Sequence, residues 1–240
     1  MPLSCRERSL TVVVPAYCEA DNIVGTLENV AEALSALPID AEILVIDDGS
    51  RDGTADVVRA NLHRFPSARL LVNERNMGFG WTYRRGVAAA TRACIVMVHG
   101  DNAWGAGTLQ RLFGHVGDAD VIVGYTRDMW KTRNWTRTAI SKLFTALVNA
   151  ITGRRLQYYN GLQIHQASVL KQLTIQSTGY GFQAEVLVKC LRSAKTFLEV
   201  PMDLMEREHG TSKAWRLSNA IDVARTLTLL CELEWRVAGE

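Results

Sequence analysis

The chain has 240 residues, of which 48% are hydrophobic and 22% are charged, and its formal net charge is +2. These values are typical of one globular α/β domain with its own core. So small a net charge does not indicate a nucleic-acid partner, and without a run of about 18 apolar residues no transmembrane helix is expected.

The first predicted strand, Leu10 to Val14, is a β-branched apolar run that stops at Pro15. Apolar spacing then becomes helical from Ile23 to Leu37. Between them, Tyr17 offers an aromatic face for a nucleoside base, and Glu19 offers a carboxylate for ribose hydroxyls. A plain turn before a capped helix explains the same residues equally well.

The second unit begins with the apolar run Ile43 to Ile46 and ends in Asp47 and Asp48. A glycine- and serine-rich turn separates it from a predicted helix, Ala55 to Arg64. Ligands of open α/β sheets bind beyond the carboxyl ends of parallel strands, so the two carboxylates are expected at the mouth of a pocket. A strand that ends in a solvated turn is the alternative.

A third predicted strand, Ala68 to Val72, is followed by two glycines and a predicted helix from Trp81 to Thr91. These glycines do not fit the dinucleotide fingerprint, because Gly86 comes too late after Gly80. The glycine spacing therefore argues against an NAD-binding site, and we expect none.

The fourth predicted strand, Cys94 to Val98, leads into His99 and Asp101. A carboxylate near an imidazole at a strand end could hold a divalent cation that neutralises a diphosphate, although a histidine that only forms hydrogen bonds is the alternative. The alternating units predict a doubly wound, mostly parallel α/β sheet with helices on both faces. Asp47, Asp48 and Asp101 would then share one edge.

Four motifs together resemble the family 2 glycosyltransferases of the GT-A (Rossmann-like) fold, and within them the dolichyl-phosphate mannose synthase and polyprenyl-phosphate branch. The motifs are Val14–Glu19, Asp47–Thr54, Asn76–Gly78 and Gly100–Asn102. The resemblance spans roughly Leu10 to Ala214. It implies one α/β domain made of an N-terminal tail (1–9), a nucleotide-sugar-binding half (10–124), an acceptor-binding half (125–213) and a C-terminal amphipathic helix (214–240).

The resemblance also implies roles for the residues of the donor half. Pro15, Tyr17 and Glu19 would line the base and ribose of a nucleotide-sugar. Asp47 would face the base, with Asp48 beside it.

Asp101 matches the last carboxylate of the family's Asp-x-Asp element and would hold Mg²⁺ or Mn²⁺ under the diphosphate. The chain departs from the family at His99, which replaces the first carboxylate, and at Ala103, where mannose synthases often have glutamine. Imidazole is a poor ligand for Mg²⁺, so His99 either ligates a softer cation or only orients the site.

After a predicted strand from Val121 to Gly124, the chain is basic and rich in tryptophan, and an apolar helix is predicted from Ala139 to Ile151. Interleaved Trp and Lys/Arg suit lipid headgroups, single-stranded nucleic acid or a solvated loop, and the resemblance favours the membrane. By the same resemblance, Arg127 and Arg137 match positions that approach an acceptor phosphate.

Glu185 is expected to head a helix, either as a site residue or as a first-turn carboxylate favoured by the helix dipole. A short strand is predicted from Phe197 to Pro201. The following segment resembles the family's Arg-x-x-Gly-x-Ser-Lys loop, in which Arg207 and Lys213 would contact the donor diphosphate. Without that match, a charged loop is the simpler interpretation.

The last predicted helix, Trp215 to Val237, is amphipathic, with Ala224 and Cys231 among the residues expected on its apolar face. It would lie on a membrane, pack on the domain or meet a partner subunit. The five cysteines are scattered without metal or disulfide spacing, so we expect reduced thiols. With no signal peptide, these features predict a cytoplasmic protein, peripheral at the cytoplasmic face of a membrane.

The leading hypothesis is inverting transfer of a sugar from a nucleotide-diphosphate sugar to a polyprenyl phosphate. That acceptor is already anionic, so positioning and charge neutralisation by Asp101, Arg127 and Arg137 would suffice. The first alternative is transfer to a hydroxyl of a soluble or glycan acceptor, which needs a base such as Glu185. A nucleotide-sugar-binding subunit without catalysis is the second.

Overall fold

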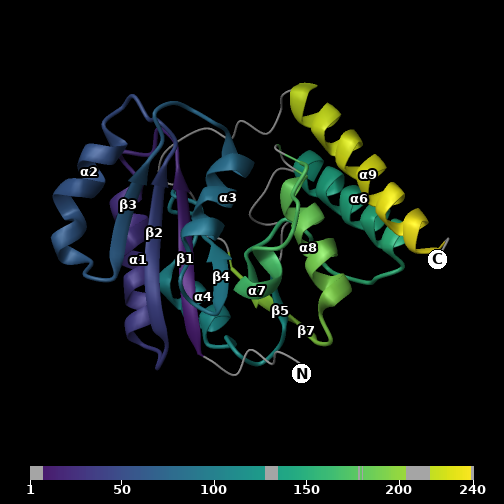
Figure 1. Ribbon diagram of the computed structural model, residues 1–240, viewed down its shortest axis with the longest axis horizontal. Coiled ribbons are helices and arrows are strands. Elements are labelled where there is room, and N and C mark those ends of the chain that lie inside the picture. Colours follow the sequence, from purple (N-terminus) through teal and green to yellow (C-terminus); the bar gives the residue numbers. More distant parts are fainter. Residues whose placement is uncertain (1–7, 128–134, 178, 180, 204–216, 239–240) are drawn as a thin grey trace.

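The part of the chain that the structure describes forms one seven-stranded sheet, in the order β3-β2-β1-β4-β6-β5-β7 (Figure 1). The computed structural model describes residues 8–127, 135–177, 179, 181–203 and 217–238. The strands are β1 (Ser9–Ala16), β2 (Asp40–Asp47), β3 (Ala68–Val72), β4 (Cys94–Met97), β5 (Val121–Thr126), β6 (Gln163–Gln166) and β7 (Phe197–Met202).

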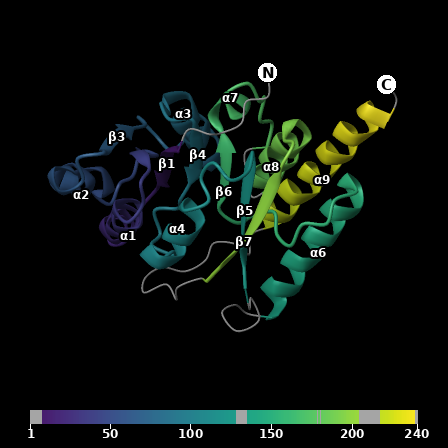
Figure 2. The same cartoon turned by 90° about the horizontal axis from the view of Figure 1, so that it is seen from below.

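The helices cover both faces of the sheet, and Figure 2 shows them from below. They are α1 (Ile23–Ser35), α2 (Thr54–Asn61), α3 (Phe79–Ala89), α4 (Ala106–Phe113), α6 (Trp135–Thr152), α7 (Ala167–Leu170), α8 (Phe182–Ser193) and α9 (Leu217–Ala238), with a short 3-10 turn at Leu62–Arg64. This arrangement confirms the predicted mostly parallel α/β sheet.

Strand direction decides which loops meet. β1 runs parallel to β2 and β4, and β2 runs parallel to β3. β6 is antiparallel to both of its neighbours, β4 and β5, while β5 and β7 are parallel. The carboxyl ends of β1, β2, β4, β5 and β7 therefore share one edge with the start of β6.

The core has two layers because the central strands are buried on both sides. In β1, Val12 and Val14 contact the side covered by α1, α2 and α4, whereas Val13 contacts the side covered by α3, α6 and α8. All eight residues of β1 are buried. Such a continuous apolar run is the expected pattern for a parallel strand between two helical layers.

The predicted apolar face of the last helix is wrong at two positions. Ala224 and Cys231 are exposed, whereas Thr226 and Leu230 are almost fully buried. The helix packs against both α6 and α8, so its buried side is set by two neighbours that the sequence pattern does not reveal. No helix in the described part of the chain is long and apolar enough to span a membrane.

The cysteine expectation also needs a correction. Cys94 is disulfide-bonded, while Cys18, Cys190 and Cys231 are free thiols. Sequence spacing alone could not show this, because it carries no information on which thiols the fold brings together.

Candidate active site

The candidate site lies at the shared edge, where β2, β1 and β4 end side by side. The N–H of Asp48 donates to the carbonyl of Ala16 at 2.9 Å, and the N–H of Gly100 donates to the carbonyl of Pro15 at 3.2 Å. The end of β1 is thus held between the acidic turn after β2 and the loop that carries Asp101. The fold brings the two predicted acidic segments together.

The turn after β1 is tied to the turn after β2. The N–H of Cys18 donates to the hydroxyl of Ser50 at 2.9 Å, and the N–H of Glu19 donates to that of Thr54 at 3.0 Å. Cys18 has a φ of +57°, a conformation that non-glycine residues rarely adopt. The ring of Tyr17, which is 38% exposed, therefore lies on a turn with a fixed backbone.

Asp47 is 1% exposed, and its two oxygens differ in environment. Oδ2 accepts the N–H of Ser50 at 3.1 Å. Oδ1 is buried and accepts no hydrogen bond from the described residues. A buried acceptor left without a donor costs about 1–3 kcal/mol, so this oxygen is suited to an N–H group of a ligand.

Asp48 instead holds another loop in place. Its Oδ1 accepts the side-chain N–H of Asn73 at 2.7 Å and the N–H of Met77 at 2.9 Å. Its Oδ2 accepts the N–H of Gly78 at 2.9 Å. Asp48 therefore fixes the segment before α3, a role that the sequence did not suggest.

Asn73 is a site-supporting residue that sequence reasoning missed. It is 4% exposed. Its side-chain oxygen accepts a hydrogen bond from Arg85, and its side-chain N–H donates to the carboxylate of Asp48. The available signal was its position directly after β3, the same place that the acidic residues occupy after β2.

The loop after β4 is anchored to α1. The N–H of Asn102 donates to the hydroxyl of Thr26 at 3.0 Å, and its side-chain oxygen accepts from Asn29 at 2.8 Å. Asn102 has a φ of +53°, which asparagine tolerates better than most residues. Gly25 leaves the space for its side chain, since a Cβ there would lie 2.6 Å from the Asn102 amide. These contacts fix the backbone next to Asp101.

His99 stacks on Phe79 of α3, with ring centroids 4.9 Å apart and an interplanar angle of 5°. Phe79 in turn meets Phe182 of α8 edge-on at 5.0 Å. The plane of the imidazole is thus held against an aromatic neighbour.

The family model of glycosyl transferase family 2 matches residues 11–172, more than half of the chain. The chain belongs to this family. An undecaprenyl-phosphate mannosyltransferase of Micrococcus luteus is 30% identical over 86% of this chain and 87% of its own length. A polyprenol monophosphomannose synthase of Mycolicibacterium smegmatis is 28% identical over 84% of this chain and 79% of its own.

Among solved structures, the glucosyl-3-phosphoglycerate synthase of Mycobacterium tuberculosis in complex with Mn²⁺, UDP and glucosyl-3-phosphoglycerate has a TM-score of 0.71 at 21% identity, covering 94% of this chain and 80% of that one. This likeness shows the fold, which is the GT-A fold.

The described residues offer few groups that could hold a metal ion. The described residues contain no cluster of three His, Cys, Asp or Glu side chains placed to hold a metal ion. Mg²⁺ at phosphate sites is often held by one or two carboxylates, with the substrate phosphates completing its shell. Asp101, half-buried at the edge, fits such a site, which the donor diphosphate must complete.

Glu185 is fully buried in the glycosyltransferase. Its carboxylate accepts the N–H groups of Gln176 at 2.9 Å and Ser177 at 2.7 Å, and it pairs with Lys189 at 2.6 Å. Burial raises the pKa of Glu185, but the hydrogen bonds from Lys189, Gln176 and Ser177 outweigh it, so the pKa is lowered. This environment suits a permanent anion that ties a loop to α8 rather than a general base.

Of the predicted phosphate-binding residues, the structure places Arg127. This exposed residue follows β5, and its N–H donates to the carbonyl of Met202 at the end of β7, 3.1 Å away, so it lies at the site edge. Arg137 belongs to α6, but its side chain lies outside the described residues, as do Arg207 and Lys213 entirely.

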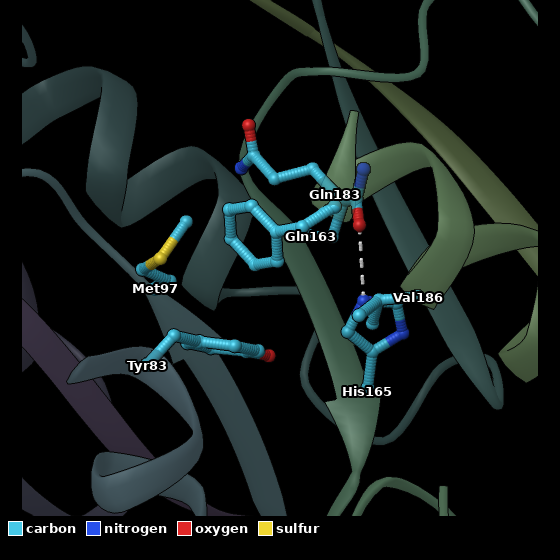
Figure 3. Close-up of a pocket in the computed structure, with 7 residues that line it drawn as sticks. Tyr83, Met97, Gln163, His165, Gln183 and Val186 are labelled. Carbon is cyan, nitrogen blue, oxygen red and sulfur yellow. Dashed lines mark hydrogen bonds between the residues drawn. The ribbon is translucent and has the colours of Figure 1, made fainter. Parts of the chain in front are cut away.

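A small cavity lies between α3, β6 and α8 (Figure 3). Its volume of about 10 Å³ fits a single water and is far too small for a nucleotide-sugar. His165 and Gln163 point toward one another there, with Nε2 and Oε1 3.1 Å apart. Burial lowers the pKa of His165 to about 3, so this imidazole is neutral. The lining residues are Tyr83, Met97, Gln163, His165, Phe182, Gln183 and Val186.

Proposed function

We propose that this glycosyltransferase moves a sugar from a nucleotide-diphosphate sugar to a polyprenyl phosphate, with inversion at the anomeric carbon. One observation carries the donor assignment. The buried Oδ1 of Asp47 accepts no hydrogen bond from the residues that the structure describes, and it lies at the same sheet edge as Asp101. The printed names of the relatives, an undecaprenyl-phosphate mannosyltransferase and a polyprenol monophosphomannose synthase, support the acceptor class.

The donor is bound by the half of the domain that spans residues 10–124. Asp47 accepts an N–H of the base, Tyr17 covers the base, and Glu19 accepts a ribose hydroxyl, with Pro15 shaping the wall. Asp101 holds a divalent cation, Mg²⁺ or Mn²⁺, which when bound neutralises the diphosphate as it leaves. The relative with the same fold contains Mn²⁺ and UDP, which supports this choice.

The acceptor is bound by residues 125–213. Arg127, with Arg137, holds the acceptor phosphate, and the guanidinium fork suits its oxygens. Arg207 and Lys213 contact the departing diphosphate. A phosphate oxygen is anionic near neutral pH, so it attacks without a general base, and one direct displacement inverts the anomeric configuration. The reaction takes place at the cytoplasmic face of a membrane.

Transfer to a hydroxyl acceptor is less well supported. That reaction needs a group to remove the hydroxyl proton. The candidate from the sequence was Glu185, whose oxygens are engaged by Gln176, Ser177 and Lys189 inside the protein.

The test compares the Asp101→Ala and Asp118→Ala variants in an assay with labelled donor and a short polyprenyl phosphate. Asp118 is a matched control, because its carboxylate is exposed and pairs only locally with His115. Loss of a group that stabilises the leaving charge should lower turnover about 100-fold in Asp101→Ala and leave Asp118→Ala unchanged.

Undiminished turnover in Asp101→Ala would rule out the metal role. Tight donor binding by the wild type without transfer under any metal would instead favour a subunit that only binds nucleotide-sugars.

A further inference from the structure

Helix α6 turns an apolar face to the outside of the protein. Trp135 is 70% exposed, Ile140 56%, Leu143 61% and Leu147 41%. These positions recur at helical spacing and so lie along one side of the helix. Three exposed alanines complete that side: Ala139, Ala146 and Ala150.

The opposite side of α6 faces the core and is partly polar. Phe144 and Val148 are buried there, and so are Thr138 and Thr145. An ordinary surface helix places its polar residues outward. Here leucine and isoleucine face outward while threonine faces inward, so the exposed side is a contiguous apolar surface of the kind that marks an interaction site.

The charges of α6 have a single sign. Its sequence contains no aspartate or glutamate, and Lys142 is the one charged residue among its exposed, described side chains. Exposed arginines flank the helix in the chain, Arg127 eight residues before its start and Arg155 three residues after its end. A cationic helix with a tryptophan at its start and an apolar face is the pattern of helices that lie in the interface of a membrane with anionic lipids.

The position of α6 suits such a contact. The helix follows β5, whose end lies at the edge of the candidate site. Figures 1 and 2 both place α6 beside α9, on the side of the molecule away from β3. The exposed side of α6 is therefore on the outside of the half assigned to the acceptor.

We propose that this side of α6, the α6 apolar face (Trp135, Ala139, Ile140, Lys142, Leu143, Ala146, Leu147 and Ala150), binds the surface of a bilayer that contains anionic lipids. The helix lies on the bilayer and does not cross it. A second copy of the chain is a poorer partner, because an α6-to-α6 contact would bring two lysine-bearing helices together without any acidic residue from either. The inference deepens the proposed function by naming the docking surface, but the binding itself requires no turnover.

The experiment measures co-sedimentation of the full chain with vesicles of phosphatidylcholine, with and without phosphatidylglycerol, and without polyprenyl phosphate. The test variant is Ile140→Glu/Leu143→Glu. The matched control is Phe197→Glu, which changes a side chain of similar exposure, 49%, on β7. The wild type and the control should bind the phosphatidylglycerol vesicles. The test variant should bind them at least about tenfold more weakly, because two apolar side chains are replaced by carboxylates that the anionic lipids repel.

Equal vesicle binding by wild type and test variant overturns the proposal, as does an absence of wild-type binding. A wild-type dimer that the test variant converts to a monomer also overturns it, since the face would then belong to a second copy. Thermal stabilisation of the test variant by a nucleotide-sugar checks that it is folded. If vesicle binding follows the prediction but no sugar is transferred to polyprenyl phosphate, the proposed function fails and this inference stands.

Discussion

Asp48 and Glu185 are buried carboxylates that hold backbone segments in place. Each accepts two main-chain N–H groups, Asp48 from Met77 and Gly78 and Glu185 from Gln176 and Ser177. In Glu185 these hydrogen bonds help to lower the pKa of the carboxyl group. Such residues can look catalytic in a sequence although their oxygens are already engaged by the protein.

Glu185→Gln tests this distinction. The amide would place an N–H₂ group against N–H donors and Lys189, so the free energy of unfolding should fall by about 3 kcal/mol in urea denaturation. Turnover of the folded variant, and its dependence on pH, should remain close to the wild type. Asp56→Asn is the control, because Asp56 forms only an exposed pair with Arg59 and should cost less than about 1 kcal/mol. Intact stability with abolished turnover would instead identify Glu185 as a base.

The segment just before β6 approaches β5 closely at a pair of glycines, and β7 packs against one of them. A Cβ on Gly161 would lie 1.9 Å from the carbonyl oxygen of Gly124, and a Cβ on Gly124 would lie 2.1 Å from the sulfur of Met202. The N–H of Gly124 also donates to the carbonyl of Leu162 at 2.7 Å. The absence of side chains here lets the segment before β6 pass close to β5.

Gly161→Ala should therefore push β6 away from β5. We expect a loss of about 2 kcal/mol or more in the free energy of unfolding, measured in urea, because backbone must move. Gly107→Ala in α4 is the control, since nothing lies within 4 Å of a Cβ there. Alanine in a helix should leave that variant as stable as the wild type or slightly more stable. Equal stability of both variants would show that the β5–β6 contact relaxes easily.

Several elements follow directly from the sequence pattern. The predicted strand from Ala68 to Val72 agrees with the structure, as do the first strand and its helix within a few residues. Long apolar runs and helical spacing carry this information locally. The helix α4 was not predicted, although its buried Leu109, Leu112 and Phe113 recur at helical spacing. The buried side of α9 was wrong at Ala224 and Cys231 because two neighbouring helices select it.

The residues of the candidate site also fall into a group that the sequence could predict and a group that it could not. Acidic residues at strand ends could be located from the sequence, because parallel strands place those ends at one edge. The contacts of Asn102 and the neutral state of His165 could not be predicted, since they depend on residues of other elements and on burial. The partner of Asn102, for example, is Asn29 of α1, far away in the chain. Asn73 was missed although its position directly after β3 was a usable signal.

For the molecule as a whole, His165 should make stability depend on pH. Burial lowers its pKa from an ordinary 6.5 to about 3. Between these values the unfolded chain binds a proton that the folded protein does not, so stability falls as the pH falls. The slope from this group is about 1.4 kcal/mol per pH unit.

The free energy of unfolding, measured by urea denaturation at a series of pH values below 6.5, checks this dependence on pH. His165→Gln removes the titrating group and should give a flatter curve than the wild type, while the lowered pKa of Glu42 and Glu185 affects both proteins alike at more acidic pH. Parallel curves for the two proteins would contradict a neutral, buried His165.

The position of β6 in the sheet also affects how the chain folds during its synthesis. β5 pairs only with β6 and β7, and β4 has β1 on one side and β6 on the other. Until Gln163–Gln166 emerges from the ribosome, the nascent chain carries a four-stranded half-sheet whose β4 edge is bare, and such edges invite wrong pairing between chains. Synthesis arrested after residue 126 should therefore yield an aggregation-prone product that depends on chaperones, and not a separately folded donor-binding half.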